Sequence, residues 1–528
     1  MGATGFPLGA SLLVVAPEIG LALLAVIVLG LDVGIPGIMR PLGEGRKQLT
    51  AVVCGVWLAL LAALVLLLSP EVIKEIIRQA DPTVSDQALN QMFFWGGMIR
   101  YDVLAQLFKV IVLAAASITS LMSYGVKGIG RKPEFYLVLV VSALGMTLMS
   151  GASDLIMVFL ALETTSIPLY ILAGFKREDT RSSESGMKYF LFGSFASAIM
   201  LYGLSLLYGF TGHTNLYDLA GYLGSGMFAS NPVPVLAAMV LVIVGFGFKI
   251  SAVPFHFWTP DVYEGAPTPV TAFLSVASKA ASFALLIRFF VAVFPSTLVI
   301  GGQDMQNFWV QLLAASAVIS MTVGNVVALA QKNIKRLLAY SSIAHAGYTL
   351  IGVAALQSTT LNGQTQAVAS VAFYMFMYMF TNLLAFAVVV IFSEATGSET
   401  IADLAGLSRR SPWLALLMTI ALLSLAGIPP TAGFVGKFFL FNAAVGANLT
   451  WLAIIGVLNA IVALYYYLVV IKVMYVNRSE DEDKPIPVSR PYVWVLAITA
   501  IALILLGTVA VQPVFEWALR SAGSLFPG

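Results

Sequence analysis

The stretch VPVLAAMVLVIVGFGFKISAVPFHFWTPD, residues 233–261, decides the fold class of this chain. Its first part is an unbroken apolar run, and Lys249, Pro254 and His256 follow where the hydrophobicity is highest. Proline breaks or kinks a helix because it lacks a backbone N–H and clashes with the preceding turn. The stretch therefore predicts a membrane-spanning helix that is interrupted beside a charged side chain.

The composition of the whole chain also indicates a membrane protein. Of its 528 residues, 59% are hydrophobic and 10% are charged, whereas soluble domains carry roughly 25% charged residues. A net charge of +2 gives no basis for a nucleic-acid partner. The one cysteine, Cys54, excludes an internal disulfide, and the three histidines lack the spacing of metal ligands. We expect an all-α polytopic membrane protein whose first apolar segment is retained as a span.

A bilayer core of about 30 Å requires about 20 apolar residues per helix, which gives about 14 transmembrane helices here. The spans are expected at 11–31, 49–69, 102–124, 134–151, 153–175, 186–211, 233–258, 268–293, 307–330, 336–356, 366–392, 412–447 with a break, 448–473 and 491–517. The polar segment 69–102 starts with an amphipathic pattern and is expected at the outer interface.

The basic residues orient this arrangement. If the N-terminus lies outside, the cytoplasmic connections contain Arg40, Arg46, Lys47, Lys127, Arg131, Lys132, Lys176, Arg177, Arg181, Lys332, Lys335, Arg336, Arg409, Arg410, Lys472, Arg478, Lys484 and Arg490. The outer connections and the tail contain Lys74, Arg78, Arg100 and Arg520. Cytoplasmic connections are enriched in lysine and arginine, so both termini are predicted on the outer side.

Six basic residues remain inside the predicted spans. Lys109 and Arg288 lie near span ends, where we expect their side chains to extend to the interface. The others are Lys188, Lys249, Lys279 and Lys437. A charge at the centre of a bilayer helix costs about 2.5–3.5 kcal/mol on insertion scales, so such residues usually face a bundle interior or a watery cavity.

Lys249 has a candidate partner in Glu163, in the middle of the fifth span. One interpretation is a passive pair that holds two helices together. The other is a proton site, because a Glu–Lys pair titrates as a unit and changes when either partner moves. Asp154, at the start of the same span, is expected to cap a helix instead.

Polar side chains recur at helical spacing on three later spans. The eighth span has Thr268, Thr271, Ser275, Ser278, Lys279 and Ser282. The tenth has Ser341, Ser342, His345 and Thr349, and the eleventh has Tyr374, Tyr378 and Asn382. Such stripes can be seams of small hydroxyl residues between helices. The lysine and the histidine favour a hydrated proton path instead.

A second broken helix predicts an internal repeat. Gly427, Pro429 and Pro430 interrupt the twelfth span beside Lys437, as Pro254 interrupts the seventh beside Lys249. Each broken helix is the fourth of five spans, so the second five-helix unit would be inverted relative to the first. The predicted division is 1–133 for helices 1–3, 134–293 and 307–475 for the two inverted repeats, and 491–528 for helix 14.

Four long motifs resemble the antiporter-like membrane subunits of the proton-pumping NADH-quinone oxidoreductases, respiratory complex I. They are ESGMKYFLFGSFASAIMLYG (184–203), GFGFKISAVPFHFWTPDVYEGAPTPVTAFLSVASK (245–279), IKRLLAYSSIAHAGY (334–348) and GIPPTAGFVGKFFLF (427–441). Within that family, the L type has a long C-terminal lateral helix and the M type is expected to have a glutamate in place of Lys437. The chain therefore resembles the N type best.

The resemblance implies roles for particular residues. Glu163 and Lys249 match the family's pair on helices 5 and 7, and Lys188, Lys279 and Lys437 match lysines on helices 6, 8 and 12. The implied water path between the lysines includes His256 and His345. The resemblance also implies other complex I membrane subunits as partners, a bacterial inner membrane as the location, no cofactor on this chain, and NADH, FMN, iron–sulfur clusters and quinone on other subunits.

Two alternatives share these features. An Mrp-type cation/proton antiporter subunit would use the same lysines and broken helices, and a structural subunit could retain a vestigial channel. A redox enzyme acting alone is disfavoured, because the sequence has no cysteine cluster and no dinucleotide-binding glycine fingerprint.

Overall fold

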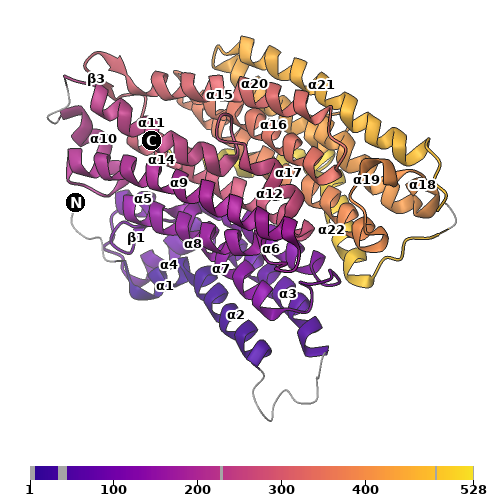
Figure 1. Cartoon of the computed structure of the whole chain (residues 1–528). Helices are drawn as coiled ribbons and strands as arrows, with labels where there is room; N and C mark the ends of the chain where they lie inside the picture. The colour runs from indigo at the N-terminus through magenta and orange to yellow at the C-terminus, as the bar shows by residue number, and fades with distance from the viewer. Residues whose placement is uncertain (1–5, 34–44, 226–229, 482–483, 527–528) are drawn as a thin grey trace.

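The computed structural model describes residues 6–33, 45–225, 230–481 and 484–526. Arg40, which the orientation argument places in a cytoplasmic connection, lies outside these ranges, and so do the side chains of Arg46 and Lys47. Figure 1 shows a bundle of helices, many of which lie roughly side by side.

The predicted set of about 14 transmembrane helices is confirmed. In the described residues, 12 helices are long and apolar enough to cross a bilayer, and a pair bent by 63° adds a further span. The single-helix spans are α3 (Gly45–Leu67), α6 (Val103–Met122), α7 (Pro133–Gly151), α8 (Leu155–Ala173), α9 (Thr180–Thr211), α15 (Met305–Ala328), α17 (Leu361–Thr396), α21 (Thr450–Tyr475) and α22 (Arg490–Gly507).

The other spans found in this way are α1 (Leu8–Val14) with α2 (Ala16–Val33), α11 (Val233–Ile250), α13 (Thr268–Phe273) with the π-helical turn η2 (Leu274–Ser278) and α14 (Lys279–Val293), and α16 (Ile334–Ala354) with the 3-10 turn η3 (Ala355–Gln357). The broken twelfth span consists of two shorter apolar helices, α19 (Pro412–Ala426) and α20 (Ala432–Gly446). The short helix α12 (Trp258–Gly265) follows α11 after its break. The connections hold α4 (Pro70–Ala80), α5 (Asp86–Gln91), β1 (Phe93–Phe94), β2 (Ile99–Arg100), α10 (Leu216–Ser225), β3 (Val299–Ile300), β4 (Gln303–Asp304), η4 (Ile401–Leu404), α18 (Leu407–Arg410) and α23 (Val511–Gly523).

Both predicted helix breaks are present. α11 ends where Ser251 adopts a left-handed conformation (φ 61°), and α19 ends at Gly427 (φ 85°). Prolines follow in each break, at Pro254 and at Pro429–Pro430, so neither helix continues in register. Each break leaves the last carbonyls of a half-helix without the partners that a continuous helix would supply.

The two sets of five spans pack in corresponding ways. α7 packs on α8 as α15 packs on α16, and α9 packs on α11 as α17 packs on α19 and α20. The division into two inverted repeats, and its boundaries, stay a prediction.

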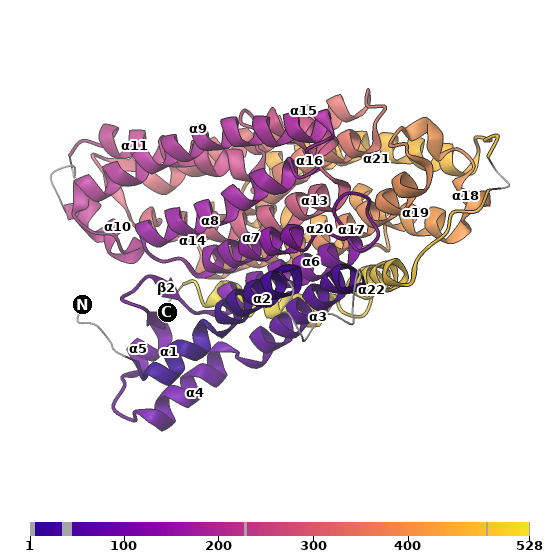
Figure 2. The ribbon, with the colours of Figure 1, turned by 60° about the horizontal axis from the view of Figure 1, so that its bottom comes forward.

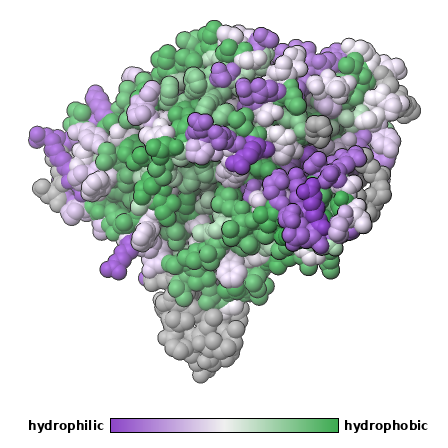
Figure 3. Space-filling view, turned by 180° about the vertical axis from the view of Figure 1, so that it is seen from behind, coloured by the Kyte–Doolittle hydropathy of each residue, from purple (hydrophilic) through white to green (hydrophobic). Residues whose placement is uncertain are grey.

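The helices differ sharply in burial. α6, α14, α16 and α17 are almost wholly covered by neighbouring helices, whereas fewer than half of the residues of α9, α21 and α22 are buried. Apolar residues cover much of the face in Figure 3, as expected of a surface in contact with lipid. Cys54 is fully buried on α3.

The C-terminal span is shorter than expected. The sequence predicts one helix over 491–517, but α22 ends at Gly507 and α23 is a separate helix that packs on α6 and α17. Gly507 lies against the break of the twelfth span, where an added Cβ would come within 2.7 Å of the carbonyl oxygen of Pro430. The turn after Gly507 therefore follows from contact with a distant segment.

The two ends of the described chain lie at one end of the molecule. Figure 2 shows α1, β2 and the C-terminus at the same end, and Arg100 on β2 donates a 2.7 Å hydrogen bond to the carbonyl oxygen of Ser524. The segment 69–102 starts with the amphipathic helix α4, whose Ile73 and Ile77 are buried.

Candidate functional site

Lys249 is buried in the last turn of α11. Its ammonium group donates a hydrogen bond to the hydroxyl of Ser166 on α8, and it lies 5.8 Å from the ring centre of Tyr170 and 5.7 Å from that of Phe248. The sequence predicts a break at Pro254, and α11 ends at Ile250, directly after Lys249. The amine contacts hydroxyl and aromatic groups inside the bundle.

Glu163 lies one turn before Ser166 on α8, on the same face of the helix. It acts on Lys249 electrostatically, but between these two described side chains there is no direct ion pair, and one carboxylate oxygen of Glu163 is buried without a hydrogen-bond partner. Glu163 and Lys249 therefore do not contact each other directly. The lysine donates its hydrogen bond to Ser166 instead. Asp154 accepts a hydrogen bond from the backbone N–H of Ile156 and caps α8, as expected.

Lys279 lies near the centre of one of the two most buried spans. It follows the π-helical turn η2 directly, and such turns inside α-helices are rare and occur frequently at functional sites. Its ammonium group donates hydrogen bonds to the carbonyl oxygen of Ser342 at 2.8 Å and to the Ser342 hydroxyl at 2.7 Å. The polar stripes predicted on the eighth and tenth spans therefore meet at this lysine.

The eleventh span completes this network. Tyr378 donates to the Ser342 hydroxyl (3.1 Å), and Asn382 donates to Tyr378 (3.2 Å) and to Ser275 on η2 (2.6 Å). A continuous row of hydrogen bonds thus joins Ser275 to Lys279 through three helices. All of these side chains are buried.

His345 lies on α16 between two tyrosines. Its Nδ1 is 2.6 Å from the hydroxyl of Tyr374, and its Nε2 is 3.5 Å from the hydroxyl of Tyr467. The imidazole is within electrostatic reach of both Lys279 and Lys437. Each ring nitrogen of the histidine therefore faces a hydroxyl group that can donate or accept a proton.

Lys437 on α20 reaches back to the end of α19. Its ammonium group donates to the carbonyl oxygens of Leu425 (2.9 Å) and Ala426 (3.0 Å) and lies 4.6 Å from the ring centre of Tyr348. The C-terminal end of a helix carries partial negative charge, which favours a cation. Gly427 makes room for this contact, because a Cβ there would lie 3.0 Å from Cδ of Lys437.

Lys188 belongs to a different group of charges. We call the set Glu184, Lys188, Asp261, Glu264 and Arg336 the ionic cluster. Lys188 pairs with Glu184 and Asp261, both at 2.7 Å, and Arg336 pairs with Asp261 (2.7 Å) and Glu264 (2.9 Å). The four members on α9 and α12, which are Glu184, Lys188, Asp261 and Glu264, line a pocket of about 220 Å³. Burial raises the pKa of Asp261, but the hydrogen bonds and charges of Lys188 and Arg336 outweigh burial and hold this pKa below its ordinary value.

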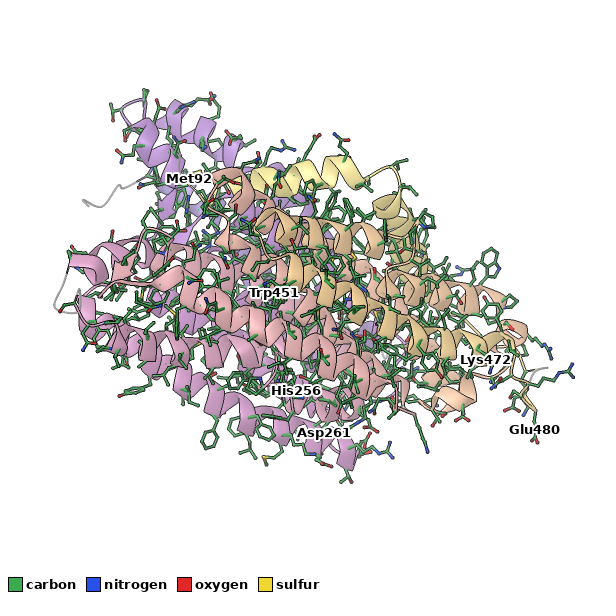
Figure 4. All side chains as sticks on the ribbon, turned by 90° about the horizontal axis from the view of Figure 1, so that it is seen from above. Met92, His256, Asp261, Trp451, Lys472 and Glu480 are labelled. Carbon is green, nitrogen blue, oxygen red and sulfur yellow. The ribbon has the colours of Figure 1, made fainter. Side chains whose placement is uncertain are left out.

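His256 is half-buried in the break between α11 and α12. The centres of its ring and of the Phe257 ring are 5.2 Å apart. Its Nδ1 is buried without a hydrogen-bond partner. Figure 4 shows it with Asp261 near the edge of the molecule formed by α9. Within the described residues, no hydrogen bond joins His256 to Lys249 or Lys279, so its predicted place on the path stays a prediction.

The expectation for Lys109 and Arg288 is wrong. Both side chains are buried, and both are paired with carboxylates. Lys109 pairs with Glu18 at 2.8 Å, and Arg288 makes two 2.8 Å hydrogen bonds to Asp102. Position along a helix suggested access to the interface, but the carboxylates come from helices far away in the sequence. These pairs tie α2 to α6 and α14 to the start of α6.

Two buried cations that the sequence placed in connections form ion pairs that were not predicted. Arg100 lies 3.5 Å from Asp102. Lys335, counted among the residues of a connection, is buried in the first turn of α16 and forms an ion pair with Glu399 at 3.0 Å. Asn333 accepts hydrogen bonds from the backbone N–H groups of Lys335 and Arg336 and so begins the helix before the lysine. An asparagine at this position is a helix-start signal that could have revealed the burial.

Within the described ranges, no group of three or more His, Cys, Asp or Glu side chains could hold a metal ion. The expectation that this chain binds no cofactor rests on the sequence alone.

Comparison with known proteins gives consistent matches. The family model described as NADH:quinone oxidoreductase/Mrp antiporter, transmembrane, matches residues 152–463. NADH-quinone oxidoreductase subunit N of Desulfitobacterium hafniense is 42% identical over 82% of this chain and 88% of its own length. The subunit N of Heliobacterium modesticaldum is 47% identical over 79% of this chain and 84% of its own length.

Solved structures show the same fold. A chain of respiratory complex I from Thermus thermophilus matches with a TM-score of 0.71 and 30% identity, over 95% of this chain and 98% of that one. A chain of the Mrp complex from a Dietzia species has a TM-score of 0.76 at 19% identity, over 98% of this chain and 97% of that one. The second likeness concerns the fold alone.

Proposed function

Because the chain belongs to the NADH:quinone oxidoreductase/Mrp antiporter membrane family, we propose that its buried lysines carry protons across the membrane in the order Lys249, Lys279, His345, Lys437. The chain is a proton-translocating membrane subunit of an NADH-quinone oxidoreductase, and the expected N type is confirmed by relatives at 42–47% identity. No redox chemistry is assigned to it.

One observation carries the proposed path. Lys249, Lys279 and Lys437 are all buried in spans, and the oxygen atoms that accept their hydrogen bonds are neutral hydroxyls and carbonyls. The protonated form of such an amine keeps its hydrogen-bond partners. Because no carboxylate is in contact with the amine, its charged form is not strongly stabilised and it can also lose its proton.

Glu163 would set the charge of the first site. We propose that Lys249 takes up a proton while Glu163 is close and releases it when the carboxylate moves or is neutralised. Unit charges about 4 Å apart interact by roughly 1–4 kcal/mol at effective dielectric constants between 80 and 20. Redox energy from other subunits would reach this chain as such electrostatic changes between neighbours. The ionic cluster with Lys188 would form the mouth of this first site.

The next transfers follow the hydrogen-bonded groups. A proton on Lys279 would pass to His345, which is flanked by Tyr374 and Tyr467. His345 would pass it to Lys437, where the carbonyl ends of α19 stabilise the cation. Release to the outer side from Lys437 would complete one translocation. The role of His256 on this path stays a prediction.

Substitution of Lys279 tests the proposal. In membrane vesicles that contain the assembled complex, Lys279→Ala should abolish NADH-driven acidification and slow coupled quinone reduction, whereas the exposed Lys472 (Figure 4), changed to alanine, should leave both unchanged. Unaltered pumping by Lys279→Ala in a correctly assembled complex would mean that the channel is vestigial.

We also propose the setting of the chain. It is a multi-pass membrane protein whose relatives belong to complex I. The finer proposals are a bacterial inner membrane, both termini outside, neighbouring antiporter-like and small membrane subunits, and NADH, FMN, iron–sulfur clusters and quinone on other subunits. The distribution of basic residues between connections supports this orientation. Co-purification with hydrophilic redox subunits would support it, and isolation with Mrp-type subunits alone would contradict it.

A further inference from the structure

The ammonium group of Lys437 contacts an aromatic ring as well as two carbonyl groups. A protonated lysine has three N–H donors, and two of them are directed to the carbonyl oxygens of Leu425 and Ala426. The same nitrogen lies over the ring of Tyr348 on α16, 4.6 Å from the ring centre. A cation at this distance is attracted by the negative face of an aromatic ring. Tyr348 is therefore a third group that stabilises the charge on Lys437.

Tyr348 also contacts the histidine that precedes Lys437 on the proposed path. It follows His345 by three residues on α16, so the two side chains lie on one face of the helix. Their ring centres are 5.6 Å apart, and the two rings are tilted by 75°. The Tyr348 ring is thus in contact with both the donor and the acceptor of the last proposed transfer.

A buried network of hydrogen bonds fixes the position of Tyr348. The carboxamide nitrogen of Asn325 on α15 donates to the Tyr348 hydroxyl and to the backbone carbonyl oxygen of Asn459 on α21, both at 3.1 Å. The hydroxyl of Tyr466 donates to the amide oxygen of Asn325 at 3.1 Å. Because a backbone carbonyl group can only accept, it is the nitrogen of Asn325 that meets Tyr348. The side chains of Asn325, Tyr348 and Tyr466 are all buried.

The contact between α15 and α16 does not need these polar groups. It is made at Gly324 and Gly347, where an added Cβ would come within 2.8 Å of backbone atoms of the opposite helix. A hydroxyl and a carboxamide buried in the same contact cost free energy unless they are hydrogen-bonded. An apolar pair would fill the contact without that cost. What the hydrogen bond between Asn325 and Tyr348 adds is a fixed position for the Tyr348 ring.

We propose that the ring face of Tyr348 enables Lys437 to hold the proton that it receives, and that Asn325 is the positioning residue that keeps this ring over the ammonium group. In the transfer, a ring nitrogen of His345 loses a proton and the neutral amine of Lys437 gains it. The ring then stabilises the new positive charge without supplying a carboxylate that would retain the proton. The inference rests on the proposed function, because it needs Lys437 to be a proton carrier.

Fluorinated phenylalanines at position 348 test the ring face. Each fluorine withdraws electron density from the ring with little change in its size, so the attraction for a cation weakens in steps. In vesicles that contain the assembled complex, NADH-driven acidification per complex should fall from Tyr348→Phe through the monofluorinated to the trifluorinated ring. The total fall should be about tenfold, which corresponds to about 1.4 kcal/mol.

Phe441 provides the matched control for this series. It lies on α20 with Lys437, and its ring centre is 6.4 Å from that of Tyr348. The same fluorinated residues at position 441 should leave acidification unchanged. Equal acidification throughout the series at position 348, or an equal fall at position 441, would overturn the role of the Tyr348 ring.

A double-mutant cycle tests the positioning role of Asn325. Asn325→Leu and Tyr348→Phe should each lower acidification per assembled complex about threefold, because each removes the same hydrogen bond. The double variant should then be no slower than the slower single variant. Losses that multiply in the double variant would show that Asn325 does not act through Tyr348.

A variant of the lysine separates this inference from the proposed function. Lys437→Ala should abolish acidification in the assembled complex. If Lys437→Ala acidifies normally, the proposed proton path itself fails. If Lys437→Ala is inactive while the fluorinated series at position 348 shows no change, the path stands and only the role of Tyr348 fails.

Discussion

The chemistry of the acceptor atoms separates two classes of buried cation in this bundle. Lys109, Arg288 and Lys335 each contact a carboxylate. The lysines of the proposed path instead donate to neutral oxygens. A carboxylate in contact stabilises the charged form strongly, whereas a hydroxyl or carbonyl leaves both forms of an amine accessible. The hydrogen-bond partner, more than burial itself, therefore distinguishes the lysines of the proposed proton path from the cations that form structural ion pairs.

The hydroxyl of Ser166 should therefore matter for the first carrier. Ser166→Ala removes the acceptor of the Lys249 hydrogen bond, and a hydrogen bond to a charged group contributes about 1.5–3 kcal/mol. We expect pumping to fall about tenfold, with a shifted pH profile, because 1.4 kcal/mol corresponds to a factor of ten. The exposed Ser205, changed to alanine, serves as the control. Identical pH profiles of wild type and Ser166→Ala would rule out this role.

The Arg288–Asp102 pair should contribute to stability. Asp102→Asn leaves a fully buried guanidinium without its charged partner, and breaking a buried pair from one side costs about 3–5 kcal/mol. Thermal unfolding of the purified subunit complex should show a lower midpoint. An unchanged midpoint in Asp102→Asn would contradict this assignment.

Among the elements, the broken twelfth span has the tightest backbone contact. An added Cβ at Gly433 would lie 3.0 Å from the hydroxyl of Ser424 and far inside contact distance of its carbonyl oxygen. Gly433→Ala must therefore push α20 away from α19, which would displace Lys437 from the carbonyls it contacts.

We expect Gly433→Ala to reduce both stability and pumping. Gly446 on the same helix is the matched control, since no atom lies within 4 Å of its hypothetical Cβ. Steady-state amount of the assembled complex and NADH-driven acidification measure the two effects. Equal amounts of assembled complex and equal acidification for the two alanine variants would show that the close contact between α19 and α20 is not required.

The elements also show what a sequence can predict and what it cannot. The breaks beside Lys249 and Lys437 were predictable because proline and glycine act on the chain locally. The end of α22 was not, because it depends on Gly507 meeting a segment about 75 residues earlier, a contact that no local pattern encodes.

Pairing was harder to predict than periodicity. Helical spacing placed Ser275, Tyr378 and Asn382 on polar stripes, yet it did not show that Asn382 links the other two. Likewise, Glu163, the candidate partner of Lys249, lies on α8, but the hydrogen bond of the lysine goes to Ser166, one turn later. Which atoms meet depends on how neighbouring helices are rotated against each other.

At the scale of the whole molecule, the proposed path crosses both sets of five spans, and its two middle members, Lys279 and His345, lie on almost wholly covered helices. Lipid-facing helices such as α9 and α21 surround it with apolar side chains. The ionic cluster joins α9 and α12 of the first set to α16 of the second. It therefore fastens the two sets to each other at one end of the molecule.

The pH dependence of the stability that the ionic cluster contributes follows from the ionisation of Asp261. Its folded-state pKa lies below the ordinary 3.8, so its stabilising effect is present above pH 3.8 and is lost as the pH falls through the lowered value. Charged groups that face it are Lys188, Glu184, Arg336 and Glu264. The difference in unfolding midpoint between wild type and Asp261→Asn should be constant from pH 7 to about 5 and disappear in stronger acid. A difference that vanishes near neutral pH would contradict this.

The fully covered position of Cys54 has a practical consequence for watching the protein at work. Maleimide dyes and nitroxide labels react with accessible thiols, and this chain has only that one sulfhydryl, sealed between helices. A single cysteine introduced at an exposed site such as Thr400, on the rim of a polar pocket of about 320 Å³, would therefore report from that site alone, in a chain that is otherwise unmodified.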